Sequence, residues 1–187
     1  MLNSSFYYSK WPFCCTAVRI YLYICTALYP LISGAIILSS DKFYISDLTL
    51  PIHIALLCFI AAEDIITMTI PDFFNALLFF NGITLHLITS GLLIAIKSAL
   101  SSIIIFVFMY VFVLLTGNKI GGGDIKTISA SAAYSGLKNT LYALSAAFFS
   151  AAFFCIFILL FSKEKRAGRK IPFGPFISFN VLLMLLN

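Results

Sequence analysis

The chain consists of apolar stretches about 20 residues long, which follow one another with only short polar segments between them. A helix of this length crosses a hydrocarbon core of about 30 Å, and lipid leaves the backbone no partners outside the helix. Alternating strands typical of a membrane barrel are absent from the sequence. The sequence therefore predicts an all-α, polytopic transmembrane helix bundle. We expect about seven spans, at residues 17–39, 48–66, 73–96, 98–116, 123–137, 139–162 and 172–187.

The composition leaves little material for a water-soluble unit, because 61% of the 187 residues are hydrophobic and 10% are charged. We expect residues 1–187 to form a single integral-membrane domain whose first helix is not cleaved as a signal peptide. His53 and His86 lie on separate expected helices without ligand spacing, so we expect no metal site. The cysteines form no CxxC pair, so we expect no soluble N-terminal CxxC domain; they are Cys14, Cys15, Cys25, Cys58 and Cys155.

The orientation follows from the basic residues, which accumulate in short loops on the cytoplasmic side. An odd number of spans puts the termini on opposite sides, and an N-terminus inside places most basic residues in the cytoplasm. The inner segments then hold Lys10, Arg19, Lys119, Lys126, Lys163, Lys165, Arg166, Arg169 and Lys170, and the outer ones Lys42, Lys97 and Lys138. We expect the run SKEKRAGRK to anchor the inner face at anionic lipid headgroups, without binding nucleic acid.

Two aspartates stand at the edges of these apolar stretches: Asp64 ends one of them, and Asp124 lies in the segment KIGGGDIK. A carboxylate at bilayer depth is costly and is tolerated mostly where it faces a bundle interior or a wet cavity. The expected orientation brings both acids to the cytoplasmic face, where they can meet and share one proton. The ionised acid would activate a water against a peptide carbonyl that the protonated acid polarises, without metal or cofactor.

Two other interpretations of the acids stay open at this point. In the first, each acid is neutralised separately by a lysine or caps a helix. In the second, Asp64 and Asp124 form a proton or cation relay in a transporter or channel, a common use of intramembrane acids.

The residues around Asp124 have a structural and a functional interpretation. Gly121, Gly122 and Gly123 permit backbone angles closed to other residues and close approach by another chain, and their amides can bind an extended substrate. An ordinary tight turn or close helix packing would use them as well. We expect Lys126 to reach the cytoplasmic surface and not to pair with Asp124, because a separation of two residues does not share a helical face.

Two proline-containing segments are interpreted as structural. Pro71 and Asp72 precede an apolar run, where Asp is a good N-cap and Pro suits the first turn of a helix. Gly174 and Pro175 interrupt the last expected span, and we favour a kink that accommodates packing over the rim of a substrate groove.

Three segments in this order, EDIITMTIPD, GGGDIK and KIPFGPF, resemble the type 4 prepilin peptidase family, the membrane aspartic proteases with a GxGD motif. The first matches the family's pattern of Asp, five residues, an aliphatic residue, Pro and Asp or Asn. The resemblance implies a catalytic role for Asp64 and for Asp124, with Gly121 and Gly123 as the motif glycines. The third segment is similar to the family's late IPFGP segment, at residues 171–175.

The resemblance implies an endopeptidase that cleaves the basic leader from type 4 prepilin or pseudopilin precursors at the cytoplasmic face of the bacterial inner membrane. Without the loop with two CxxC pairs found in many members, the chain resembles the short, peptidase-only type. We therefore expect neither methyltransferase activity nor S-adenosylmethionine as a cofactor.

Alternatives within the wider class are less favoured. An archaeal preflagellin peptidase would share both aspartate motifs, but the IPFGP segment favours the bacterial prepilin type. Presenilin-like proteases also have GxGD, but Glu63 precedes Asp64 here in place of their tyrosine.

Overall fold

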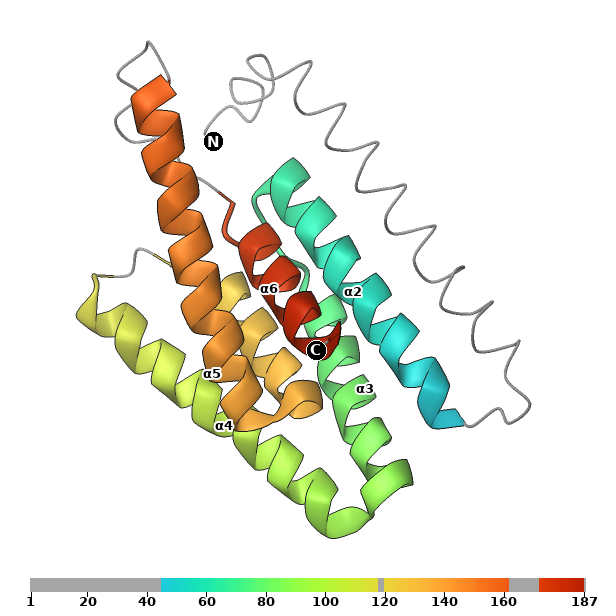
Figure 1. Cartoon of the computed structure of the whole chain (residues 1–187). Coiled ribbons are helices and arrows are strands. Elements are labelled where there is room, and N and C mark those ends of the chain that lie inside the picture. The colour runs from blue at the N-terminus through green and yellow to red at the C-terminus, as the bar shows by residue number, and fades with distance from the viewer. Residues whose placement is uncertain (1–44, 118–119, 162–171, 187) are drawn as a thin grey trace, which may run out of the picture.

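The computed structural model describes residues 45–117, 120–161 and 172–186, and every element in these ranges is an α-helix. The helices are α2 (Ile45–Thr67), α3 (Asp72–Ser90), α4 (Leu92–Leu115), α5 (Gly122–Phe161) and α6 (Gly174–Leu186) (Figure 1). The predicted all-α architecture is therefore confirmed for this part of the chain. The span expected at 17–39 lies outside the described residues.

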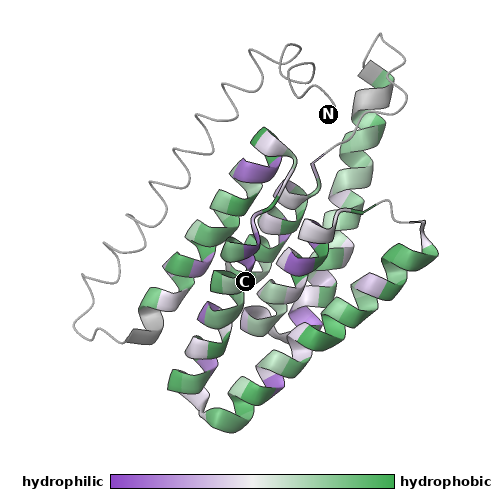
Figure 2. Cartoon of the chain, turned by 180° about the vertical axis from the view of Figure 1, so that it is seen from behind, coloured by the Kyte–Doolittle hydropathy of each residue, from purple (hydrophilic) through white to green (hydrophobic). Residues whose placement is uncertain are grey.

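Four of the described helices are long and apolar enough to cross a membrane, at Leu48–Thr67, Asp72–Ser90, Leu92–Leu115 and Gly122–Phe157. Hydrophobic residues cover most of each helix, and hydrophilic positions are few (Figure 2). Large apolar side chains on α4, such as Leu93, Ile103 and Leu115, are exposed. This surface is the kind that lipid covers, and the structure describes an integral membrane protein.

The junction between α3 and α4 differs from the prediction of spans at 73–96 and 98–116. Helix α3 ends at Ser90, and the chain turns at Gly91, whose φ of 86° favours glycine. Lys97, expected in the loop, lies inside α4 and is exposed. The prediction was wrong here because a lysine was taken as the end of an apolar stretch, whereas the backbone turns at the glycine.

Helix α5 is broken at Gly136, where φ is 77° and ψ is 169°. Its second part turns back beside the first (Figure 1), which agrees with separate segments expected at 123–137 and 139–162. The first part is about 20 Å long, as is α6 with its 13 residues. Both are shorter than a hydrocarbon core of about 30 Å, so seven full spans are not confirmed.

Small residues bring α3 and α4 against the first part of α5. A Cβ atom at Gly82 would lie 2.6 Å from the carbonyl carbon of Ala133, so only glycine allows this approach. The Ser98 hydroxyl donates to the carbonyl oxygen of Ala133, and Ser102 donates to that of Ser129 at 2.6 Å. The core beside these contacts is aliphatic, with Leu57, Ile60, Leu78, Ile105, Ile128 and Ile177 fully buried. The first part of α5 is thereby held at the centre of the bundle.

The short helix α6 packs against both α2 and α5. Helix α2 ends at Thr67, and the next residue, Met68, has a φ of 56°, so the chain leaves the helix axis there. This arrangement brings the last turns of α2 to the first turns of α5 and α6.

Candidate active site

Asp64 lies one turn before the end of α2 and is 7% exposed. Its Oδ2 accepts a hydrogen bond of 2.8 Å from the backbone N–H of Gly174, the first residue of α6. The start of a helix carries free N–H groups and partial positive charge, so this position favours a carboxylate. The contact joins residues 110 positions apart.

Asp124 lies in the first turn of α5 and is 9% exposed. A backbone hydrogen bond from Gly121 reaches its carboxyl group, whereas its Oδ1 has no partner among the described residues. The charge of Asp64 acts on Asp124 through space. Both predicted acids are therefore buried where the end of α2 meets the starts of α5 and α6.

The three glycines before Asp124 differ in what they permit. A Cβ atom at Gly123 would lie 2.9 Å from Cβ of Ile70, so this glycine allows the α2–α3 linker to approach. A Cβ at Gly121 would lie 3.2 Å from Oδ2 of Asp124, and at Gly122 it would meet nothing within 4 Å. None of the three has a positive φ, so the expected use of unusual backbone angles is wrong, whereas the expected close approach is confirmed at Gly123.

Asp72 and Lys126 form an ion pair at the same end of the bundle. The Lys126 Nζ lies 2.7 Å from Oδ1 of Asp72 and 2.8 Å from its Oδ2, and both side chains are largely exposed. The N-cap of α3 is Pro71, without a side-chain cap, so the expectation of Asp72 as the N-cap is wrong. Asp72 lies in the first turn, where its charge suits the helix end. Lys126 does not pair with Asp124, as expected, but its partner was not foreseen.

Gly174 and Pro175 begin α6 and do not interrupt it, so the predicted kink is wrong. A Cβ atom at Gly174 would lie 2.8 Å from Oδ2 of Asp64. Any larger residue at position 174 would therefore collide with the Asp64 carboxyl group that its own N–H group binds. The segment KIPFGPF, which contains Gly174, thus contacts the segment EDIITMTIPD, which contains Asp64.

Two further polar residues lie at this site and were missed by the sequence analysis. The Thr127 hydroxyl donates to Oδ1 of Asn75 at 2.9 Å, and both side chains are buried. Asn75 follows Asp72 by one turn and Thr127 follows Asp124 by one turn. Polar residues repeated at helical spacing after an acid were the available signal.

The histidines lie elsewhere in the bundle. Nδ1 of His53 lies 3.4 Å from the amide nitrogen of Asn81, and Nε2 of His86 lies 3.1 Å from the carbonyl oxygen of Tyr134. In the described ranges, no three His, Cys, Asp or Glu side chains gather as a metal site.

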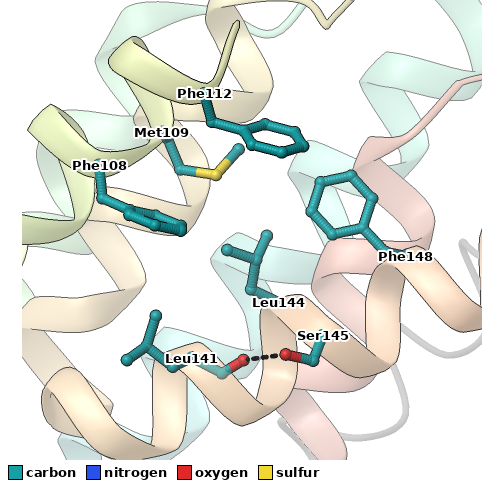
Figure 3. A pocket seen from close by; sticks show the side chains of 7 residues that line it. All are labelled: Phe108, Met109, Phe112, Leu141, Leu144, Ser145 and Phe148. Carbon is teal, nitrogen blue, oxygen red and sulfur yellow. Dashed lines mark hydrogen bonds between the residues drawn. The ribbon is translucent and has the colours of Figure 1, made fainter. Parts of the chain in front are cut away.

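A cavity of about 230 Å³ between α4 and the second part of α5 is separate from the acids. Its lining is almost wholly apolar, and its single hydroxyl, on Ser145, donates to the carbonyl oxygen of Leu141 (Figure 3). Such a lining offers no group for acid–base chemistry.

The fold and site define a helical membrane protein with two buried carboxyl groups at converging helix ends. The family model described as the type IV leader peptidase family matches residues 52–156, which is more than half of the chain and includes Asp64 and Asp124. The chain belongs to the type IV leader peptidase family. No curated protein and no solved structure matches it.

Proposed function

We propose that this protein is a membrane aspartic endopeptidase that removes the short basic leader from type 4 prepilin or pseudopilin precursors. Membership of a leader peptidase family gives a protease that acts on a protein substrate. The observation that supports the finer proposal is that Asp64 and Asp124 are both buried at converging helix ends. Each accepts a hydrogen bond from a backbone N–H group, that of Gly174 and that of Gly121. The family match favours this function over a proton or cation relay.

In the proposed reaction, Asp64 and Asp124 share one proton in the resting site. The ionised carboxyl takes a proton from a water molecule as its oxygen attacks the scissile carbonyl carbon, and the protonated carboxyl donates to the carbonyl oxygen. When the C–N bond breaks, the leaving amine takes up a proton from the pair. Neither a metal nor a nucleophilic side chain is required for these steps.

The glycine segment before Asp124 has exposed backbone in two of its positions, Gly121 and Gly122. An extended substrate can hydrogen-bond such backbone, and the missing side chains leave room for it. We assign this segment to binding the residues around the scissile bond.

In this proposal, the orientation in the membrane also selects which peptide bond of the precursor is cleaved. The apolar stem of the precursor lies among the helices, while its basic leader stays in the cytoplasm. The junction between them then falls beside Asp64 and Asp124, provided that this end of the bundle faces the cytoplasm.

The proposed function is tested by incubating the purified protein in detergent or vesicles with a prepilin, a pseudopilin and a preflagellin. We expect mass spectrometry to find a new N-terminus after the basic leader of a prepilin or pseudopilin. An uncut set of precursors, or cleavage of the preflagellin alone, would contradict the proposal.

A further inference from the structure

The linker between α2 and α3, residues 68–71, contacts the surroundings of both acids. It begins at Met68, whose N–H group donates to the carbonyl oxygen of Asp64 at 3.0 Å and closes the last turn of α2. Near its other end, the side chain of Ile70 packs against Gly123, the residue before Asp124. The linker therefore contacts α2 at one acid and α5 beside the other.

The path of this linker is fixed by its own residues. The Thr67 hydroxyl donates to the carbonyl oxygen of Glu63 at 2.9 Å, and its oxygen accepts from the Thr69 hydroxyl at 2.8 Å. Met68 has a φ of 56°, which few residues other than glycine adopt. Pro71 ends the linker with a φ of -65° that its ring imposes. The linker is thus a spacer of set geometry between α2 and the first turn of α5.

The side chain of Ile70 lies along Gly123 with several of its carbons. A Cβ atom at Gly123 would lie 2.9 Å from Cβ of Ile70, 3.3 Å from its Cγ1 and 3.4 Å from its Cδ1. The isoleucine is partly buried and packs against the hydrophobic core. Because the contact is close-packed, a shift of Ile70 moves Gly123 and, with it, the neighbouring Asp124.

Two polar contacts also join α3 to α5, but neither uses a residue adjacent to the acid. The ion pair of Asp72 with Lys126 has both side chains largely exposed, so it contributes about 1 kcal/mol or less. The side chains of Asn75 and Thr127 lie 2.9 Å apart, one helical turn beyond the acid. The apolar contact of Ile70 is therefore the one that reaches the neighbour of the acid.

Resting on the proposed peptidase function, we propose that Ile70 is a positioning residue, which holds the first turn of α5 through Gly123 and so sets where the Asp124 carboxyl group lies relative to Asp64. Two carboxyl groups share one proton only at short distance, and a displacement of about 1 Å near the chemistry costs about 100-fold in rate. Ile70 has no polar group and takes no part in the chemical steps. Its contribution is the separation between the acids.

The experiment measures kcat and KM for prepilin cleavage by purified variants, together with the thermal unfolding of each. Ile70→Val retains the two carbons nearest to Gly123 and loses only Cδ1, so we expect a kcat close to that of the wild type. Ile70→Ala also loses Cγ1. We expect its kcat to fall by about 10-fold to 100-fold with little change in KM, because the acids are displaced and the substrate contacts are not.

The same contact is tested from its other side. Gly123→Ala adds a methyl group 2.9 Å from Cβ of Ile70 and should lower kcat by about 100-fold. In the double variant with Ile70→Ala, the loss should be smaller than the product of the two single losses, because both changes act on one contact.

Leu144→Ala is the control for general destabilisation. Leu144 is 4% exposed and lines the apolar cavity that is separate from the acids. This variant should melt at a lower temperature than the wild type, because it loses buried packing, and it should keep its kcat.

Several results would overturn the role of Ile70 while wild-type cleavage leaves the proposed function standing. These are a kcat of Ile70→Ala near that of the wild type, a loss confined to KM, single losses that multiply fully in the double variant, or failure of Ile70→Ala to fold. Wild-type kcat in Gly123→Ala, or an equal loss in Leu144→Ala, would do the same. An inactive wild-type protein would instead refute the peptidase function on which the inference rests.

Discussion

At the scale of single residues, Gly174 matters because it has no side chain. Its N–H group donates to Oδ2 of Asp64 at 2.8 Å, and a Cβ atom built on it would lie 2.8 Å from the same oxygen. No real Cβ atom tolerates that separation, so any other residue must displace the carboxyl group or α6. The position of the Asp64 carboxyl group is thereby tied to one glycine.

Gly174→Ala is therefore expected to reduce leader cleavage by about 100-fold, because small displacements of a catalytic group have effects of this size. The measurement is kcat on a purified prepilin. Ser101→Ala is the control, since the Ser101 hydroxyl donates only to the carbonyl oxygen of Lys97 in its own helix, away from both acids. Equal activities of the two variants would contradict the role given to Gly174.

The sequence predicted those site residues whose side chains cost much free energy to bury in a membrane. Asp64 and Asp124 stood out because a carboxyl group needs a reason to be there. Asn75 and Thr127 did not, because neutral polar side chains cost less and are common in membrane helices. The Asp72–Lys126 pair depends on how α3 and α5 pack, and its members are 54 residues apart in the chain.

At the scale of helices, the break at Gly136 turns α5 back on itself (Figure 1). A φ of 77° with a ψ of 169° is a conformation that residues other than glycine adopt only under strain. The turn lets one central segment present Asp124 while a second part of the helix packs beside α6.

Gly136→Ala is expected to destabilise the protein by about 1–3 kcal/mol, the cost of forcing an alanine into this backbone region. The change is measured as thermal unfolding in detergent. Gly122→Ala should have the opposite sign, a gain of up to about 1 kcal/mol, because that glycine is helical and open to its surroundings. A Gly136→Ala variant as stable as the wild type would show that the break does not need glycine.

The helix ends were predicted correctly where the end of an apolar stretch coincides with a turn at a glycine. The end of α2 and the division of α5 were close to expectation. The α3–α4 junction was displaced because Lys97 interrupts the apolar pattern without ending the helix. A lysine near the end of a membrane helix can extend its charged group to the interface, so the backbone continues through it.

At the scale of the whole molecule, the proposed function depends on which membrane face holds the acids. The count of basic residues predicts that the segments around 117–122 and 163–170 lie in the cytoplasm and that the segment around 41–46 lies outside. A leader that stays in the cytoplasm can reach Asp64 and Asp124 only in this orientation.

Single cysteines placed in these segments of an otherwise cysteine-free protein test the orientation. We expect probes at 117–122 and 163–170 to be protected from an impermeant reagent added outside intact cells, and probes at 41–46 to react. Labelling after membrane disruption shows that each probe is reactive. The reverse pattern would place the acids on the wrong face for a leader peptidase.

The central claim is that Asp64 and Asp124 act as one catalytic pair. It is tested most directly by kcat for prepilin cleavage in Asp64→Asn and Asp124→Asn, beside Asp72→Asn as a control at an exposed, ion-paired carboxyl group. We predict that each of the first two variants folds but loses about 1,000-fold or more, because an amide can neither take nor share the proton. Asp72→Asn should stay close to wild-type activity, since an exposed ion pair contributes about 1 kcal/mol or less. Substantial cleavage by either Asp64→Asn or Asp124→Asn would contradict the account.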